Sequence, residues 1–279
     1  MRVTRPQRAR EAATPILGFR AISNVMNPHQ HNYAAVIEWD EKRTREISGM
    51  LKPYLQVTDA YADLICEIVD VIGTEKPAST QDIVVRDLLA DVFDALVEAR
   101  RIILMGKCST AYPIARRVYE SLSLMALCVL DSKIADQWHS GQEIANRVVR
   151  KELAKHPLGE PEDDTKKLYK FFTIGAHPNR DLIPRRFLGE GNEFVLGSVC
   201  APNLVLVTEY CAIHLRMWFW FTVMLLHHYQ HLVDAAKPDF GTRYLHVADR
   251  AQRLQAEFDR NYDRLLHEEQ SRHAKAGNS

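Results

Sequence analysis

The sequence predicts an all-α protein, a helical bundle of about seven or eight helices with one small hairpin or ordered loop near residues 185–198. Apolar residues recur at helical spacings through most of the chain after residue 32, and proline and glycine separate these segments. With 279 residues and 46% hydrophobic content, the chain can bury a sizeable core. We therefore expect residues 33–279 to form a single helical-bundle domain, preceded by a disordered or loosely ordered basic arm at residues 1–32.

The first three helices have recognisable ends. One helix is expected over residues 34–51, and a second begins after Pro53 and ends at Gly73. Ser79 is a good N-terminal cap for a long third helix, which Gly106 closes. All three segments carry apolar residues at helical spacings, as the packed helices of a bundle require.

The fourth helix is expected to begin at Ser109 or Thr110, either of which can cap it, with Pro113 in its first turn. A fifth segment covers residues 132–156 and has a weak point at Gly141. A short sixth helix with several aromatic residues follows an acidic linker. These segments continue the helical pattern through the middle of the chain.

The last third of the chain contains the only segment that departs from helical periodicity. Residues 175–198 hold several prolines and glycines, and the stretch at residues 185–198 is typical of a hairpin or an ordered loop. A long helix rich in aromatic residues is then expected over residues 201–236, and an amphipathic helix over residues 244–275.

Composition excludes several classes of function. The 36 basic and 36 acidic residues cancel, so no overall field directs the protein to nucleic acid or to a membrane. The five cysteines form no CxxC pair, which is typical of free thiols in the reducing cytoplasm. The most apolar stretch, residues 217–226, has about half the length that a membrane span needs. The sequence also lacks the GxxxxGK[ST], GxGxxG and GxSxG motifs, so we expect a cytoplasmic protein without a cofactor.

Charged residues stand in the fourth helix, which is otherwise almost entirely apolar. Arg116 and Arg117 lie four and three residues before Glu120, so both can reach its carboxylate. A structural ion pair and a ligand-facing polar pocket both explain this pattern. We expect Arg117 to be the covered partner of Glu120, with Arg116 leaning toward solvent. The pocket interpretation adds His177, which precedes a proline, and Tyr169 at the same end of the bundle.

Two further patterns offer catalytic interpretations. His227 and His231 lie at i and i+4 on one helix face with Asp234 nearby, a spacing that can hold a divalent metal ion. Without an HExxH glutamate, a cluster of histidines at the boundary of the apolar helix explains the pattern equally.

The Arg-x4–6-His motif of helical ribonucleases known as HEPN proteins occurs twice, as Arg150 to His156 and as Arg260 to His267. The second match is the better one, and Arg260 and His267 would act in catalysis. Arg-to-His spacings of this kind also arise by chance, and a solvated helix face is the alternative.

The string LMGKCSTAYPIARRVYESLSLMALCVLDSKIADQWHSGQ, followed later by LYKFFTIGAHPN, resembles a set of uncharacterised bacterial helical proteins, which are domains of unknown function. The resemblance covers about residues 88–231 and implies a bacterial, cytosolic, all-α fold without an established reaction. Some of these proteins are similar to HEPN proteins from defence or toxin–antitoxin loci, although Arg260 and His267 lie outside the matched region. The positions that carry the pattern are Gly106, Ala111, Ala115, Arg116, Arg117, Tyr119, Glu120, His177 and Pro178.

The leading hypothesis from the sequence is a helical-bundle protein that binds a ligand or partner at a polar pocket containing Arg117, Glu120, Tyr169 and His177. The apolar helix at residues 217–226 would be covered within one chain or across the twofold interface of a homodimer. A HEPN-like ribonuclease of a defence or toxin–antitoxin system, which would bind nucleic acid, is the first alternative. A metal-dependent helical-bundle enzyme is the second.

Overall fold

The computed structural model describes residues 33–159, 161–176 and 204–276. All regular secondary structure in these ranges is helical, which confirms the predicted all-α class. The arm at residues 1–32, the expected hairpin at residues 185–198 and His177 lie outside the described residues. The helices are α1 (Tyr33–Met50), α2 (Lys52–Gly73), α3 (Thr80–Leu104), α4 (Cys108–Leu130), α5 (Ser132–His139), α6 (Asn146–Leu153), α7 (Glu162–Ala176), α9 (Leu204–Ala236) and α10 (Phe240–Ala276).

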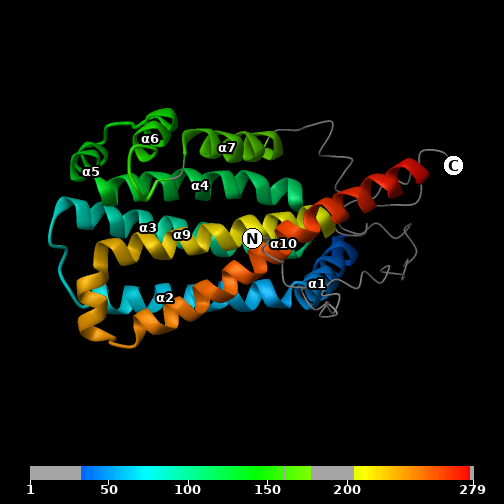
Figure 1. Cartoon of the computed structure of the whole chain (residues 1–279), viewed down its shortest axis with the longest axis horizontal. Coiled ribbons are helices and arrows are strands. Elements are labelled where there is room, and N and C mark those ends of the chain that lie inside the picture. The colour runs from blue at the N-terminus through cyan, green and yellow to red at the C-terminus, as the bar shows by residue number, and fades with distance from the viewer. Residues whose placement is uncertain (1–32, 160, 177–203, 277–279) are drawn as a thin grey trace, which may run out of the picture.

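The long helices α2, α3, α4, α9 and α10 run roughly along the longest axis of the molecule (Figure 1). Helices α3 and α4 form an antiparallel hairpin, and they share the most extensive contact between any two helices of the described chain. Helix α9 packs against α2, α4 and α10, and the shorter helices α5, α6 and α7 pack against α4. The outer face of α4 therefore lies under a second, shorter layer of helices.

The core extends through this arrangement and centres on α9 and its neighbours. Trp218 and Phe221 of α9 are fully buried, and the ring of Trp218 makes an edge contact with Phe93 of α3. Tyr112 of α4 packs edge-on against Tyr210 of α9. Helix α9 thus carries the apolar surface that the aromatic-rich sequence of residues 217–226 indicates, and its buried rings contact α3 and α4.

Two glycines end helices with the same backbone hydrogen-bond pattern. At the end of α3, Gly106 has a φ of 75°, and the amides of Gly106 and Lys107 bond back to the carbonyls of Ile103 and Ile102. At the end of α5, Gly141 has a φ of 83°, and the amides of Gly141 and Gln142 bond to Trp138 and Gln137. This pattern of paired backward bonds needs a left-handed residue, which glycine adopts without strain.

The helix boundaries confirm some sequence expectations and correct others. Ser79 caps α3 by accepting a hydrogen bond from the amide of Asp82, as predicted. The segment expected at residues 132–156 is not one helix, and it divides into α5 and α6 at Gly141, the weak point that the sequence indicates. The cap expected at Ser109 or Thr110 is wrong. The turn at Gly106 leads directly into α4, which begins at Cys108, so Pro113 lies beyond the first turn.

Candidate functional site

Four polar side chains from α4, α6 and α7 meet on the outer face of α4, and we call Arg116, Glu120, Arg150 and Tyr169 the Tyr169 cluster. Arg116 Nε donates to Glu120 Oε1 at 2.9 Å, and Arg116 Nη2 donates to the Tyr169 hydroxyl at 2.6 Å. The guanidinium carbon of Arg116 also lies 4.9 Å from the centre of the Tyr169 ring. The hydrogen bond to Glu120 raises the pKa of the Arg116 guanidinium, so this group keeps its positive charge.

Arg150 of α6 brings a second guanidinium to the same ring. Its guanidinium carbon lies 4.3 Å from the centre of the Tyr169 ring, within the range of a cation–π interaction. Within the described part of the chain, Arg150 forms no hydrogen bond or ion pair. Its nitrogen donors therefore remain available, because an aromatic face attracts the positive charge but satisfies none of the in-plane N–H groups.

Arg117 does not take the place that the sequence analysis assigned to it. Its side chain is 67% exposed and forms an ion pair with Asp91 of α3, which also accepts a hydrogen bond from Ser121. The expectation that Arg117 pairs with Glu120 while Arg116 leans outward is therefore wrong. Consecutive residues point about 100° apart around a helix, so Arg117 is directed toward α3 while Arg116 is directed toward α7.

The other members of the expected pocket have mixed outcomes. Tyr169 does lie beside Glu120, since Arg116 hydrogen-bonds to both. His177 lies outside the described residues. Arg150 is a member that sequence reasoning did not place in the pocket. The sequence places Arg150 in a short basic segment and in a motif match with His156, and no spacing relates it to Tyr169, 19 positions further along the chain.

Additional basic residues lie near Arg150 and Tyr169 along their helices. Arg147 and Lys151 lie within one turn of Arg150 on α6, and Lys166 and Lys170 lie within one turn of Tyr169 on α7. All four side chains are exposed, and none forms an ion pair within the residues that the structure describes. Helices α6 and α7 together contain six basic and four acidic residues, so a small excess of positive charge remains here although the whole chain is neutral.

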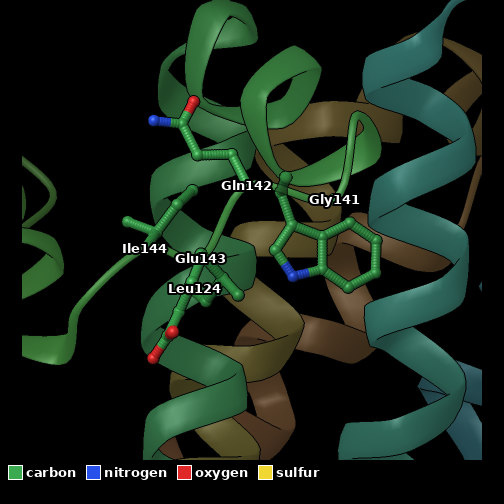
Figure 2. Close-up of a pocket in the computed structure, with 6 residues that line it drawn as sticks. Leu124, Gly141, Gln142, Glu143 and Ile144 are labelled. Carbon is green, nitrogen blue, oxygen red and sulfur yellow. The ribbon is translucent and has the colours of Figure 1, made fainter.

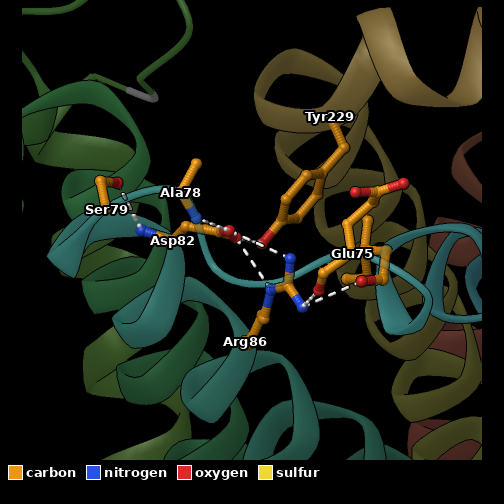
Figure 3. Close-up of polar contacts among 7 residues, drawn as sticks. Glu75, Ala78, Ser79, Asp82, Arg86 and Tyr229 are labelled. Atoms are coloured by element: carbon orange, nitrogen blue, oxygen red, sulfur yellow. Dashed lines mark hydrogen bonds and ion pairs between the residues drawn. The ribbon is translucent and has the colours of Figure 1, made fainter.

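A second polar cluster lies where α2, α3 and α9 meet, and it contains Asp82, Arg86 and Tyr229 (Figure 3). Arg86 Nε and Nη2 each lie 3.0 Å from a different oxygen of Asp82, and Tyr229 Oη donates to Oδ1 at 2.5 Å. The amide of Ala78 donates to the other oxygen at 2.9 Å. Arg86 Nη1 donates to the carbonyl oxygens of Ile72, in the last turn of α2, and of Glu75, just beyond that helix. We call this group the Asp82 cluster.

Hydrogen bonding dominates the electrostatics of the Asp82 cluster. Burial on its own raises the pKa of the Asp82 carboxyl, but the hydrogen bonds from Arg86, Tyr229 and Ala78 outweigh burial and lower that pKa. Four donors hydrogen-bond to the carboxylate of Asp82. The guanidinium of Arg86 also hydrogen-bonds to backbone carbonyls where α2 ends. Both carboxylate oxygens are already hydrogen-bonded, so the cluster has a structural role and joins α2, α3 and α9.

The candidate metal residues do not form a site in the described chain. His227, His231 and Asp234 are all exposed on α9. Among the residues whose placement is described, no three His, Cys, Asp or Glu side chains gather closely enough to hold a metal ion. Of the candidate ribonuclease pair, Arg260 is exposed on α10, whereas the side chain of His267 lies outside the description.

A pocket of about 370 Å³ opens beside α4, one turn beyond Glu120. Its lining comes from Leu124 of α4, Trp138 of α5 and the connection Gly141–Ile144. In Figure 2 the carboxylate of Glu143 and the amide of Gln142 point in opposite directions from the connection. The pocket lining is thus both apolar and polar, and Glu143 carries its one carboxylate.

Three cysteines of the described chain are buried and carry no sign of reactivity. Burial raises the pKa of Cys108, Cys128 and Cys211 to about 12, so these thiols remain protonated at neutral pH. Their role is that of small apolar side chains in the core, which agrees with the sequence interpretation.

Comparison with protein-family models, curated proteins and solved structures finds no match for this chain. Within the described residues, no helix combines the length and the apolar character that crossing a membrane requires. The functional argument therefore depends on the geometry of the site.

Proposed function

We propose that this protein is a ligand-binding protein and that the Tyr169 cluster binds an oxyanion, such as the phosphate or carboxylate group of a ligand. The observation that carries the proposal is the state of Arg150. This guanidinium lies over the Tyr169 ring without a hydrogen bond or ion pair in the described part of the chain. An arginine held by an aromatic face presents its planar set of donors in a fixed orientation, which suits two-point binding of an oxyanion.

The charge balance of the cluster supports an anionic ligand. Glu120 neutralises one of the two guanidiniums, and it contacts Arg116 rather than Arg150. The cluster therefore keeps a net positive charge, and Arg147, Lys151, Lys166 and Lys170 add to it. An anion at Arg150 would gain charge-assisted hydrogen bonds, while the surrounding cations would increase its rate of encounter.

The partial burial of the site favours binding over a purely structural role. Arg116 and Glu120 are each 27% exposed, so solvent screens their ion pair and limits its contribution to folding. Tyr169 and Arg150 are likewise partly exposed. The cluster is accessible from solvent, and its geometry is maintained by the packing of α6 and α7 on α4.

The test is calorimetric titration of the full chain with inorganic phosphate at constant ionic strength. We expect saturable binding that weakens as the salt concentration rises. Arg150→Met keeps the length of the side chain and removes its charge, and it should weaken binding by roughly tenfold, the effect of losing charge-assisted hydrogen bonds. Arg150→Lys should lose part of this affinity, because an ammonium cannot offer two parallel donors.

Arg101→Met is the matched control. Arg101 is an exposed arginine on α3 and lies in an ordinary surface ion pair with Glu98. We expect this variant to bind phosphate as the wild type does. Equal affinity in Arg150→Met and wild type, or equal losses in Arg150→Met and Arg101→Met, would overturn the proposal.

A further inference from the structure

The pocket beside α4 has features that favour a cationic ligand, in contrast to the anion proposed for the Tyr169 cluster. Leu124, Trp138 and Ile144 supply the apolar part of the lining from three separate segments, and Gln142 and Glu143 supply polar groups. Glu143 supplies the only acidic side chain among the lining residues, and it forms no ion pair within the part of the chain that the structure describes. The pocket therefore offers an apolar surface, an indole ring and an unneutralised carboxylate within one opening.

We infer that this pocket binds a small organic cation, an ammonium group that carries alkyl substituents. The alkyl groups would displace water from Leu124 and Ile144, while the positive charge would interact with the Trp138 ring and the Glu143 carboxylate. Tryptophan is the aromatic residue that attracts cations most strongly. The inference is independent of the proposed oxyanion site, since none of the pocket residues belongs to the Tyr169 cluster.

Other ligand classes fit the lining less well. A metal ion needs several oxygen, nitrogen or sulfur ligands around it, and Glu143 is the only charged candidate here. An anion would meet the Glu143 carboxylate and no cationic lining residue. A neutral apolar ligand would make no favourable charge interaction with the Glu143 carboxylate. The alkylammonium class is the one that uses both the apolar lining and the carboxylate.

The backbone gives the pocket a defined shape. The left-handed conformation of Gly141 ends α5 and turns the chain toward Ile144, which then leads into α6. Because α5 and α6 both pack on α4, the connection between them is held at its two ends. Anchoring both ends limits the conformations of the connection, which lowers the entropic cost of binding a small ligand.

The experiment uses tetramethylammonium as the probe, with tert-butanol as a neutral molecule of similar size. In the full chain labelled with ¹⁵N, the four tryptophans give indole N–H signals that NMR resolves, and Trp138→Phe assigns the signal of Trp138. We expect tetramethylammonium to shift this signal saturably and to leave the other indole signals in place. The neutral molecule should bind more weakly.

Glu143→Gln tests the role of the carboxylate, and Asp136→Asn is its matched control. Asp136 is an exposed acid on α5 that does not line the pocket. We expect Glu143→Gln to weaken tetramethylammonium binding roughly two- to fivefold, as for an exposed charge pair, and Asp136→Asn to have no effect. Equal binding by tert-butanol, equal effects of the two variants, or no shift of the Trp138 signal would overturn the inference. Neither variant removes a phosphate-binding side chain, so this outcome is separable from that of the oxyanion test.

Discussion

The Asp82 cluster and the Tyr169 cluster contain the same three kinds of side chain in different states. Each pairs an arginine with a carboxylate at i and i+4 on one helix, and each adds a tyrosine hydroxyl from a distant helix. In the Asp82 cluster every carboxylate oxygen accepts two hydrogen bonds. In the Tyr169 cluster Glu120 accepts one bond from Arg116, and Arg150 contributes a guanidinium that has no anionic partner in the described chain.

The difference separates a structural role from a binding role. A polar group that is buried and fully hydrogen-bonded contributes to stability, because removing one partner leaves another without compensation. A polar group that is partly exposed and incompletely paired contributes little to folding, and its donors remain available to a ligand. The comparison therefore predicts that substitutions in the two clusters have unequal effects on stability.

The largest effect is expected from Asp82→Asn. The side chain of Asp82 is 8% exposed, and its loss of charge leaves the Arg86 guanidinium without its counter-ion. We expect the free energy of unfolding to fall by about 4 kcal/mol, measured by urea denaturation at pH 7. The matched change Glu120→Gln should lower it by less than about 1 kcal/mol. Similar losses in both variants would contradict the distinction between the clusters.

His214, a buried side chain on α9, can be compared with the two clusters, and one hydrogen bond holds its ring. Nε2 of His214 lies 3.0 Å from the carbonyl oxygen of Leu96, and burial lowers the pKa of His214 from 6.5 to about 4. The imidazole is thus neutral in the fold. Its contribution is fully present above pH 6.5 and is lost as the pH falls toward 4, because the unfolded chain takes up the proton first.

The shift corresponds to about 3 kcal/mol of stability, and the measurement is urea denaturation at several pH values between 7 and 4. His214→Gln keeps a side-chain donor for Leu96 but does not titrate. We expect the stability of the wild type to fall more steeply than that of the variant over this interval. Parallel pH profiles would mean that His214 does not titrate in this way.

The two tyrosine hydroxyls give a smaller and closely matched contrast. Tyr229→Phe removes a donor to the buried carboxylate of Asp82, and we expect a loss of about 2 kcal/mol. Tyr169→Phe keeps the ring that Arg150 contacts and removes a partly exposed acceptor of Arg116, so its loss should be below about 0.5 kcal/mol. Thermal denaturation of both variants provides the comparison, which a reversed order would refute.

The sequence predicts the helices of the described chain better than it predicts their polar contacts. Periodicity identifies helices because their hydrogen bonds and apolar faces are local, and Ser79 shows that caps can be recognised in the same way. The pairing of Tyr229 with Asp82 joins residues 147 positions apart, and no local spacing encodes it. The site depends on such contacts.

The choice between Arg116 and Arg117 illustrates the same limit within one helix. Both spacings to Glu120 are compatible with an ion pair, so the sequence alone cannot tell which arginine forms it. The structure distinguishes them because α4 has neighbours on two sides. Asp91 on α3 offers Arg117 a carboxylate, and Tyr169 on α7 offers Arg116 a hydroxyl. The positions of α3 and α7 around α4 depend on tertiary packing, which the spacing of residues within α4 does not show.

The tight turn at Gly106 also has a consequence for the order of folding. Helices α3 and α4 adjoin in sequence, so their extensive contact closes only a short loop. Helix α9 must cross a much longer stretch of chain to reach α2 and to bring Tyr229 to Asp82. We therefore expect the α3–α4 hairpin to form early in refolding, with α9 docking after the folding nucleus has formed.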